Sequence, residues 1–219
     1  MVNGRTLIPV SAEPATRHER KERTRRALLD AALGLLADAG FGGLSLREVT
    51  KQAGIVPTAF YRHFTSMDEL GVVLVEESMR TLRATIREAR RDTRSSAGII
   101  GASVRTLHEQ VRAHEDHFRF VVRERHGAAG PVRQAIAFEL KLLTSELAVD
   151  LARFKYLQDW TTEDLHVMAG LLVTAMLATV QELLDARPRD TEADERIMCI
   201  AEKKLRLITL GVPRWHSGS

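Results

Sequence analysis

The sequence has little of what marks secreted or membrane proteins. Among its 219 residues there is one cysteine, Cys199, which excludes an internal disulfide framework. No apolar run reaches the roughly 18–20 residues that a membrane-spanning helix needs; the longest, residues 168–180, is interrupted by glycine and threonine. The first residues also lack the basic-then-apolar order of a secretory signal. We therefore expect a cytoplasmic protein with no membrane partner.

Motifs that accompany catalysis are missing as well. The sequence contains no HExxH, no glycine-rich phosphate loop and no nucleophile motif. One group of imidazole and acidic residues could suggest a metal site: His108, Glu109, His114, Glu115, Asp116 and His117. Such side chains also cluster on solvated helices, so a metal-binding helical enzyme is the less favoured interpretation. We expect no catalytic residue, no metal site and no cofactor.

The charge that is present is unevenly distributed. With 44% hydrophobic and 28% charged residues, the composition is that of an ordinary globular protein. The formal net charge is only +3, yet residues 17–26 alone hold six arginines or lysines against two glutamates. A basic block is often just a solvated helix face. Here it opens the first of three short helices, and this context favours a binding role.

Local signals predict helices nearly throughout, beginning with three short ones. Apolar residues recur at helical spacing from about Arg20 to Ala39. Ser45 followed by Glu48 matches a capping box at the start of a second helix, which ends at Gly54. Pro57 suits the first position of a third helix, where its missing N–H costs nothing. The sequence therefore predicts an all-α fold.

The second and third of these helices read as a helix-turn-helix. A glycine in the joining stretch AGIVP can take the left-handed backbone conformation that the reversal requires. Phe60 and Phe64, four residues apart, then point into a small core, while Thr58, Tyr61 and Arg62 stay free to meet a ligand. In DNA-binding proteins that exposed side enters the major groove. An ordinary helical hairpin remains the competing interpretation.

The rest of the chain predicts a larger helical domain. We divide the sequence into a flexible arm (1–18), a helix-turn-helix DNA-binding domain (19–66), a helical ligand-binding and dimerisation domain (67–212) and a tail (213–219). The expected helices span about 67–91, 100–111, 118–122, 132–154, 162–186 and 191–210. One of them carries an apolar seam stepping by three and four residues: Val132, Ile136, Leu140, Leu143, Leu147, Leu151 and Phe154.

The DNA-binding half resembles a known family. The segment LSLREVTKQAGIVPTAFYRHFTSMDELG, with its YxHF element, is similar to the DNA-binding domain of TetR-type bacterial transcription regulators. With the later segment FRFVVRERHG it resembles the FabR and DesT branch, which represses unsaturated fatty acid synthesis genes. The resemblance implies a homodimeric repressor of a palindromic operator in double-stranded DNA. It also implies an acyl-coenzyme A or acyl carrier protein thioester as effector; another apolar small molecule sensed in a different pathway is the alternative.

The resemblance and side-chain chemistry together suggest roles for individual residues in DNA binding. Pro57 and Thr58 are expected to read base edges, and Arg62 to read guanine or bind phosphate. The remaining contacts are expected on the DNA backbone: Thr24, Arg25, Ser45, Arg47, Tyr61 and His63. For Tyr61 and His63, burial in the core is the alternative. Val56 stands where the family often has a capping serine or threonine, a bond that valine cannot make.

Three further features concern the regulatory half. Apolar residues on several helices could line an effector pocket, or could be plain core: Phe118, Val121, Phe138, Leu142, Met168, Leu171, Leu172 and Met176. Residues 170–180 are apolar around most of the helix, which favours pairing with a second subunit over central burial. Residues 123–125, Arg-Glu-Arg, could bind coenzyme phosphates, but an ion-paired hinge between the two halves is favoured.

Overall fold

The computed structural model describes residues 16–36, 40–91, 96–187 and 190–217, and these form an all-helical fold. The helices are α1 (Arg17–Leu35), α2 (Leu46–Gln52), α3 (Pro57–Phe60), α4 (Met67–Arg91), α5 (Ser96–Ala113), α6 (Glu115–Glu124), α7 (Gly130–Leu151), α8 (Thr162–Asp185) and α9 (Thr191–Leu210). Three short 3₁₀ turns, Phe41–Gly43, Lys155–Leu157 and Val212–Arg214, complete the described structure. Most of the expected arm and the last two residues of the tail lie outside the described residues.

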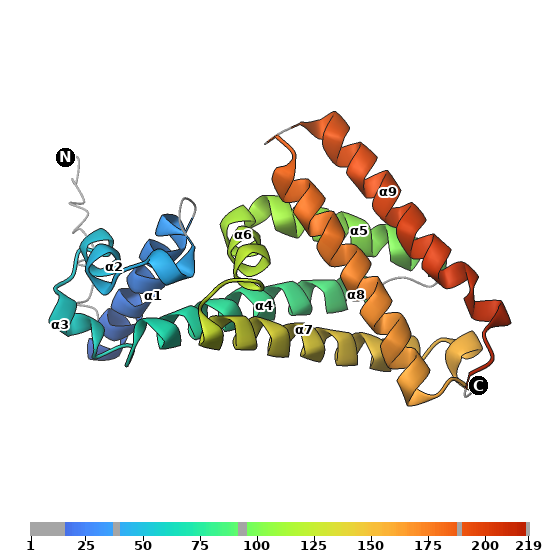
Figure 1. The fold of residues 1–219 in the computed structure, drawn as a ribbon, viewed down its shortest axis with the longest axis horizontal. Coiled ribbons are helices and arrows are strands. Elements are labelled where there is room, and N and C mark those ends of the chain that lie inside the picture. Colours follow the sequence, from blue (N-terminus) through green and yellow to red (C-terminus); the bar gives the residue numbers. More distant parts are fainter. Residues whose placement is uncertain (1–15, 37–39, 92–95, 188–189, 218–219) are drawn as a thin grey trace, which may run out of the picture.

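The three N-terminal helices form a small domain at one end of the molecule (Figure 1). Its core consists of side chains from all three helices and the first 3₁₀ turn, among them Leu28, Phe41, Val49, Phe60 and Phe64, each at most 3% exposed. Phe60 and Phe64 lie with their ring centroids 5.7 Å apart, as the four-residue spacing predicts. This packing holds the short helix α3, which is too short to be stable alone.

The remaining helices form the larger domain. The long helix α4 leaves the N-terminal domain and lies beside α7, while α8 and α9 pack on each other at the far side (Figure 1). The seam predicted on α7 is buried where it meets α4: Val132 and Ile136 have no exposed surface. Arg83 of α4 also forms a 2.8 Å ion pair with Glu139 of α7. These contacts hold α4, the helix that leaves the N-terminal domain, against α7 of the larger domain.

Helix α6 holds the two domains together through polar contacts at its C-terminus. The buried carboxylate of Glu124 accepts a 2.9 Å hydrogen bond from the backbone N–H of Phe41. The guanidinium of Arg123 donates to the carbonyl of Leu36, 3.0 Å away. Residues 123 and 124 of the predicted hinge therefore bind the backbone of the DNA-binding domain directly, rather than standing free for a coenzyme phosphate.

Some helix boundaries differ from those expected. Helix α1 begins at Arg17 rather than Arg20, because Thr16 and Glu19 form a complete capping box. It ends at Leu35, and residues 37–39 of the predicted helix lie outside the described residues. Helix α7 stops at Leu151, where the chain closes into three-residue turns, so Phe154 lies beyond the helix. The helical hydrogen-bond pattern of α3 likewise gives way to turns after Phe60.

Candidate DNA-binding surface and effector cavity

The geometry of the helix-turn-helix follows the local signals of the sequence. Ser45 caps α2: its hydroxyl accepts from the N–H of Glu48, and the Glu48 carboxylate accepts from the N–H of Ser45. Gly54 has a φ of 70°, the left-handed conformation that the turn requires. Pro57 occupies the first turn of α3. Together, the capping box, the left-handed glycine and the proline determine the direction of α3 relative to α2.

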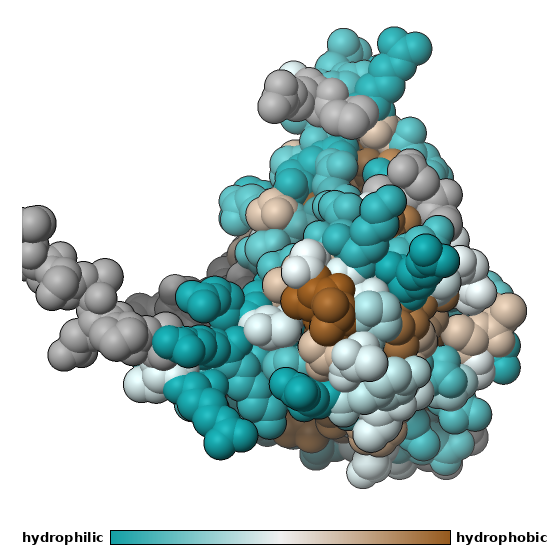
Figure 2. Space-filling view, turned by 90° about the vertical axis from the view of Figure 1, so that its left-hand side faces the viewer, coloured by the Kyte–Doolittle hydropathy of each residue, from teal (hydrophilic) through white to brown (hydrophobic). Residues whose placement is uncertain are grey.

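The outer face of α2 and α3 presents most of the residues predicted to contact DNA. Six of them are exposed: Ser45, Arg47, Pro57, Thr58, Tyr61 and Arg62. Tyr61 is 63% exposed, which excludes the alternative that its ring lies in the core. Figure 2, which views the molecule from this end, shows a mainly hydrophilic and neutral surface with a compact hydrophobic area near its centre. The face therefore offers both polar groups and some apolar surface to a partner.

Of the other three predicted contacts, Thr24 and Arg25 hydrogen-bond to the protein's own backbone and His63 is half-buried. Arg25 donates to the backbone carbonyl of His63 at 3.1 Å, and its guanidinium lies 4.6 Å from the centre of the Phe64 ring. The hydroxyl of Thr24 donates to the carbonyl of Arg20 in the preceding turn. His63 is half-buried, and burial, with Lys21 and Arg25 nearby, lowers the pKa of its imidazole. The geometry gives Arg25 a structural role in tying α1 to the turn that follows α3.

Val56, at the N-cap of α3, makes no side-chain capping bond and is 64% exposed. We expect Val56→Ser to raise the free energy of unfolding by about 1 kcal/mol, because a serine hydroxyl can accept a hydrogen bond from an N–H in the first turn of the helix. Urea unfolding of the variant beside Val56→Ala would measure this, since alanine removes the side chain without supplying a cap. Equal stability of the serine and alanine variants would contradict the prediction.

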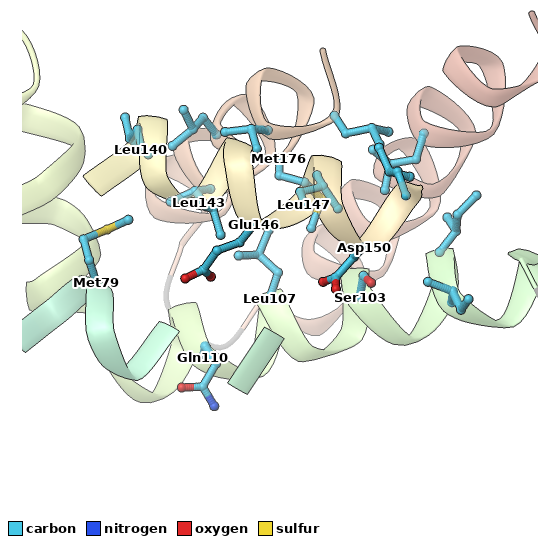
Figure 3. A pocket seen from close by; sticks show the side chains of 18 of the residues that line it. Met79, Ser103, Leu107, Gln110, Leu140, Leu143, Glu146, Leu147, Asp150 and Met176 are labelled. Carbon is cyan, nitrogen blue, oxygen red and sulfur yellow. The ribbon is translucent and has the colours of Figure 1, made fainter. Parts of the chain in front are cut away.

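A large cavity lies between the helices of the second domain. Its volume is about 800 Å³, within the range of roughly 300–1,000 Å³ typical of small-molecule sites. Figure 3 shows Leu140, Leu143 and Leu147 following one another along α7, with Met79 of α4 near the Leu140 end and Asp150 at the other. Leu107 of α5 and Met176 of α8 also line the cavity. The cavity is therefore elongated along α7 and mostly apolar.

Five of the eight predicted pocket residues line this cavity: Phe118, Val121, Met168, Leu172 and Met176. The other three do not, which corrects the expectation for them. Phe138 is 66% exposed, since at 100° per residue it stands opposite Ile136 of the buried seam. Leu142 is displaced by the same angle from Leu140 and is half-buried away from the cavity. Leu171 is 55% exposed and lies on the outer face of α8.

The cavity wall also contains polar groups that were not predicted. Ser78 of α4, His114 and His117 line the cavity. Glu146 and Asp150 of α7 lie along its wall (Figure 3). Helical spacing places His114 beside His117 and Glu146 beside Asp150, but no pattern in the sequence shows that Ser78 and these two pairs share a cavity, because their helices are far apart in the chain. The seam on α7 could have identified Leu143 and Leu147, but periodicity alone does not tell a cavity wall from a packed core.

The histidines considered as metal ligands have other partners. The Nε2 atom of His108 lies 2.8 Å from the carboxylate of Asp194, and His117 contacts Ser78. The rings of His114 and His117 lie nearly perpendicular to each other, with their centroids 6.1 Å apart. Among the described residues, no three His, Cys, Asp or Glu side chains are arranged to hold a metal ion.

Helix α8 is the one helix in the described parts of the chain that is long and apolar enough to cross a membrane. Its residues Met168, Ala169 and Val180 are buried against neighbouring helices, as in the core of a globular protein. Its outer face is apolar too, since Val167 and Leu171 are more than half exposed. Helix α9 adds Ile200, Leu207 and Leu210 to the exposed apolar residues.

Comparison with known proteins agrees with this arrangement. Residues 28–71 match the family of bacterial regulatory proteins named after TetR, and residues 97–208 match the C-terminal domain of tetracycline-repressor-like proteins. Together the two matches include the helix-turn-helix and most of the cavity wall. The first domain therefore corresponds to the DNA-binding domain of these regulators, which are transcription factors and not enzymes.

Several solved structures share the fold. The fatty acid degradation regulator FadR from Bacillus halodurans has a TM-score of 0.68 at 17% identity, covering 84% of this chain and 94% of its own. FadR from Bacillus subtilis, in complex with stearoyl-CoA, gives 0.66 at 16% identity, with 85% and 98% covered. A TetR-family regulator from Streptomyces coelicolor gives 0.66 at 20% identity, with 86% and 97% covered. By its matches over both domains, this chain belongs to the TetR family of bacterial transcriptional regulators.

Proposed function

We propose that the protein is a cytoplasmic repressor that binds a palindromic operator as a homodimer and senses an acyl chain. The observation that carries the DNA-binding part is the orientation of α3: Phe60 and Phe64 are buried, and Thr58, Tyr61 and Arg62 face outward. Pro57 and Thr58 read base edges in the major groove, while Arg47 and Tyr61 contact phosphates. Family membership supports both operator binding and the dimer.

The exposed apolar residues of α8 and α9 form the dimer interface in this proposal. Val167 and Leu171 on one helix and Ile200 and Leu207 on the other would be covered by the same residues of a second copy. A two-fold axis through this pair places two copies of α3 on one face of the DNA. Their spacing should be one helical turn of DNA, roughly 34–36 Å, or a multiple of it.

The effector in this proposal is a long-chain acyl-coenzyme A or acyl carrier protein thioester, and the regulated genes serve fatty acid synthesis. An elongated apolar cavity of about 800 Å³ accommodates an acyl chain, and flexible methionines such as Met79 and Met176 adapt to chains of different shape. The complex of the distantly similar Bacillus subtilis FadR with stearoyl-CoA supports the same class of ligand. The effector acts by binding one conformer more tightly than the other.

A second candidate is a TetR-type regulator of a different pathway with another apolar ligand. It is favoured by Glu146 and Asp150, which give the cavity wall acidic groups that an uncharged acyl chain does not use. Both candidates share the DNA-binding surface and the dimer. They differ only in the molecule that fills the cavity.

One experiment tests target and effector together. Operators are selected from random DNA with the purified protein, with and without saturated and unsaturated acyl-coenzyme A of 16 or 18 carbons. A palindromic sequence whose recovery changes with one of these thioesters is the expected result. A palindrome recovered equally with and without every thioester would reject the acyl effector and leave the second candidate. Failure to enrich any sequence would reject the DNA-binding proposal itself.

Arg47 and Thr58 should affect DNA binding in different ways. Arg47→Ala is expected to weaken binding to all sequences, because one phosphate contact is lost in each half-site. The slope of log K against log [salt] should then become shallower by about one for each half-site. Thr58→Ala should instead change which bases are preferred. Fluorescence anisotropy over a salt series measures both. Arg196→Ala, at an exposed arginine of α9, is the control and should leave the slope unchanged; an unchanged slope for Arg47→Ala would remove it from the interface.

A further inference from the structure

One end of the cavity holds a cluster of polar groups from several helices. Where α4 and α6 meet the DNA-binding domain, the wall is formed by polar groups: Arg26, Glu77, Ser78, Gln110, His114 and His117. The neighbouring wall, along α7, is formed by leucines together with the carboxylates of Glu146 and Asp150 (Figure 3). Arg26 belongs to α1, so a molecule at this end touches both domains at once. The polar end is the part of the cavity best placed to sense a specific group on the ligand.

The hydrogen bonds of Ser78 determine the tautomer of His117. The Ser78 hydroxyl lies 2.7 Å from the carbonyl of Leu74 and 2.6 Å from Nδ1 of His117. A carbonyl oxygen can only accept, so the single hydroxyl hydrogen is used for Leu74. Nδ1 of His117 must then be the donor to the Ser78 oxygen. In a neutral imidazole this leaves Nε2 as a hydrogen-bond acceptor.

The surroundings keep this imidazole neutral. Burial lowers the pKa of His117 first, and the nearby His114 and Arg26 lower it further. The acidic groups Asp116 and Asp30 act in the opposite direction and more weakly. The carboxylate of Glu77 is bonded to Arg26 at 3.0 Å. At neutral pH, His117 therefore presents a lone pair at Nε2 rather than a second N–H.

No group of the described chain donates to that lone pair. The described residues provide His117 with the Ser78 contact at Nδ1 and the ring of His114, and with no hydrogen-bond donor at Nε2. Burying an acceptor without a partner is costly, so an entirely apolar ligand end pressed against it would be disfavoured. A ligand that brings its own donor would remove that cost.

We propose that the effector carries a hydroxyl group on the part of its chain that lies beside α6, and that Nε2 of His117 accepts its hydrogen. This inference rests on the proposed role of the cavity as the site of an acyl-chain effector. The ligand class is then a hydroxylated acyl chain rather than a plain one. The leucine-lined wall along α7 holds the hydrocarbon, and the Ser78–His117 pair selects the hydroxyl.

The test compares chains that differ only in a hydroxyl group. Calorimetric titration of the full-length protein is carried out with the coenzyme A thioesters of hexadecanoic acid, 3-hydroxyhexadecanoic acid and 16-hydroxyhexadecanoic acid, named below by their acids; the two hydroxyl positions allow for either direction of the chain. We expect one hydroxylated acid to bind about tenfold more tightly than the plain acid, as one satisfied neutral hydrogen bond provides. Equal binding of all three acids would overturn the inference while leaving an acyl effector in place.

Variants of His117 identify the group responsible. His117→Phe keeps a ring of similar size but removes the acceptor, and the preference for the hydroxyl should disappear while binding of the plain acid remains. His117→Gln restores an acceptor and should recover part of the preference. His126→Phe, at an exposed imidazole that does not line the cavity, is the matched control and should keep the preference. A preference that survives in His117→Phe would overturn the inference; binding of none of the three acids would overturn both it and the proposed effector class.

Discussion

Glu124→Ala is expected to lower the free energy of unfolding by about 1–3 kcal/mol and to weaken the effect of the effector on DNA binding. In the folded protein the buried carboxylate of Glu124 accepts the hydrogen bond of the Phe41 N–H. Alanine leaves that backbone donor buried without a partner, and the cost of an unsatisfied buried group is of this size. Urea unfolding at a fixed protein concentration measures the loss.

The second part of this prediction follows from the position of α6. His117, Phe118 and Val121 of this helix line the cavity, and its C-terminal residues bind the backbone around the Leu36–Phe41 connection. A ligand that moves α6 is therefore expected to move the DNA-binding domain with it. Without the Glu124 bond, the same ligand should still bind but should change operator affinity less.

Glu124→Gln provides the control for both parts. Its side-chain oxygen can still accept from Phe41, so most of the stability and of the coupling should be retained. Anisotropy with labelled operator, with and without ligand, gives the ratio of the two affinities for each variant. An alanine variant with wild-type stability and an unchanged ratio would show that this contact does not connect the domains.

Much of the DNA-binding domain was predictable because its signals are local. Ser45 and Glu48 are three residues apart, and Phe60 and Phe64 four apart, so the capping box and the shared face depend only on helix geometry. Gly54 and Pro57 act through their own backbone angles. The same reasoning could have found the true start of α1, since Thr16 and Glu19 form another capping box. The dense positive charge beginning at Arg17 obscured that signal.

The cavity was less predictable because it depends on which helices meet. Periodicity shows that Phe138 and Ile136 lie on opposite faces of α7, but not which face borders the empty space. The contact between Ser78 and His117 joins residues 39 positions apart, and that between Arg112 and Asp194 residues 82 apart. Neither pair belongs to a sequence motif. For the same reason, only the folded structure shows that Arg25 connects α1 to the turn after α3, and that Glu124 connects α6 to the backbone of Phe41.

Asp194→Ala is expected to lower the free energy of unfolding by about 3 kcal/mol, the order found when one partner of a buried ion pair is removed. Asp194, in the first turn of α9, is only 7% exposed. Both of its carboxylate oxygens accept from the guanidinium of Arg112 on α5, and one also lies 2.8 Å from Nε2 of His108. Alanine would leave the partly buried Arg112 with Glu115 as its remaining ion-pair partner and would remove this polar link between α9 and α5.

The matched control is Glu192→Gln in the same turn of α9. Glu192 pairs with Arg196, but both side chains are largely exposed, and such a pair contributes at most about 1 kcal/mol. Urea unfolding of the two variants at the same protein concentration separates the contributions. Equal losses from both would mean that burial of the Asp194 pair adds nothing.

The effect of Asp194 should also depend on pH in a definite direction. Hydrogen bonds from Arg112, and then from His108, lower the pKa of the Asp194 carboxyl in the folded protein. A lowered pKa contributes stability that is complete above the unfolded value, about 3.9 for aspartate, and is lost as the pH falls through the folded value. The difference in unfolding free energy between wild type and Asp194→Ala should therefore be constant above about pH 5 and shrink below about pH 4. A difference that stays constant down to pH 2 would indicate that the side chain acts through packing rather than through its charge.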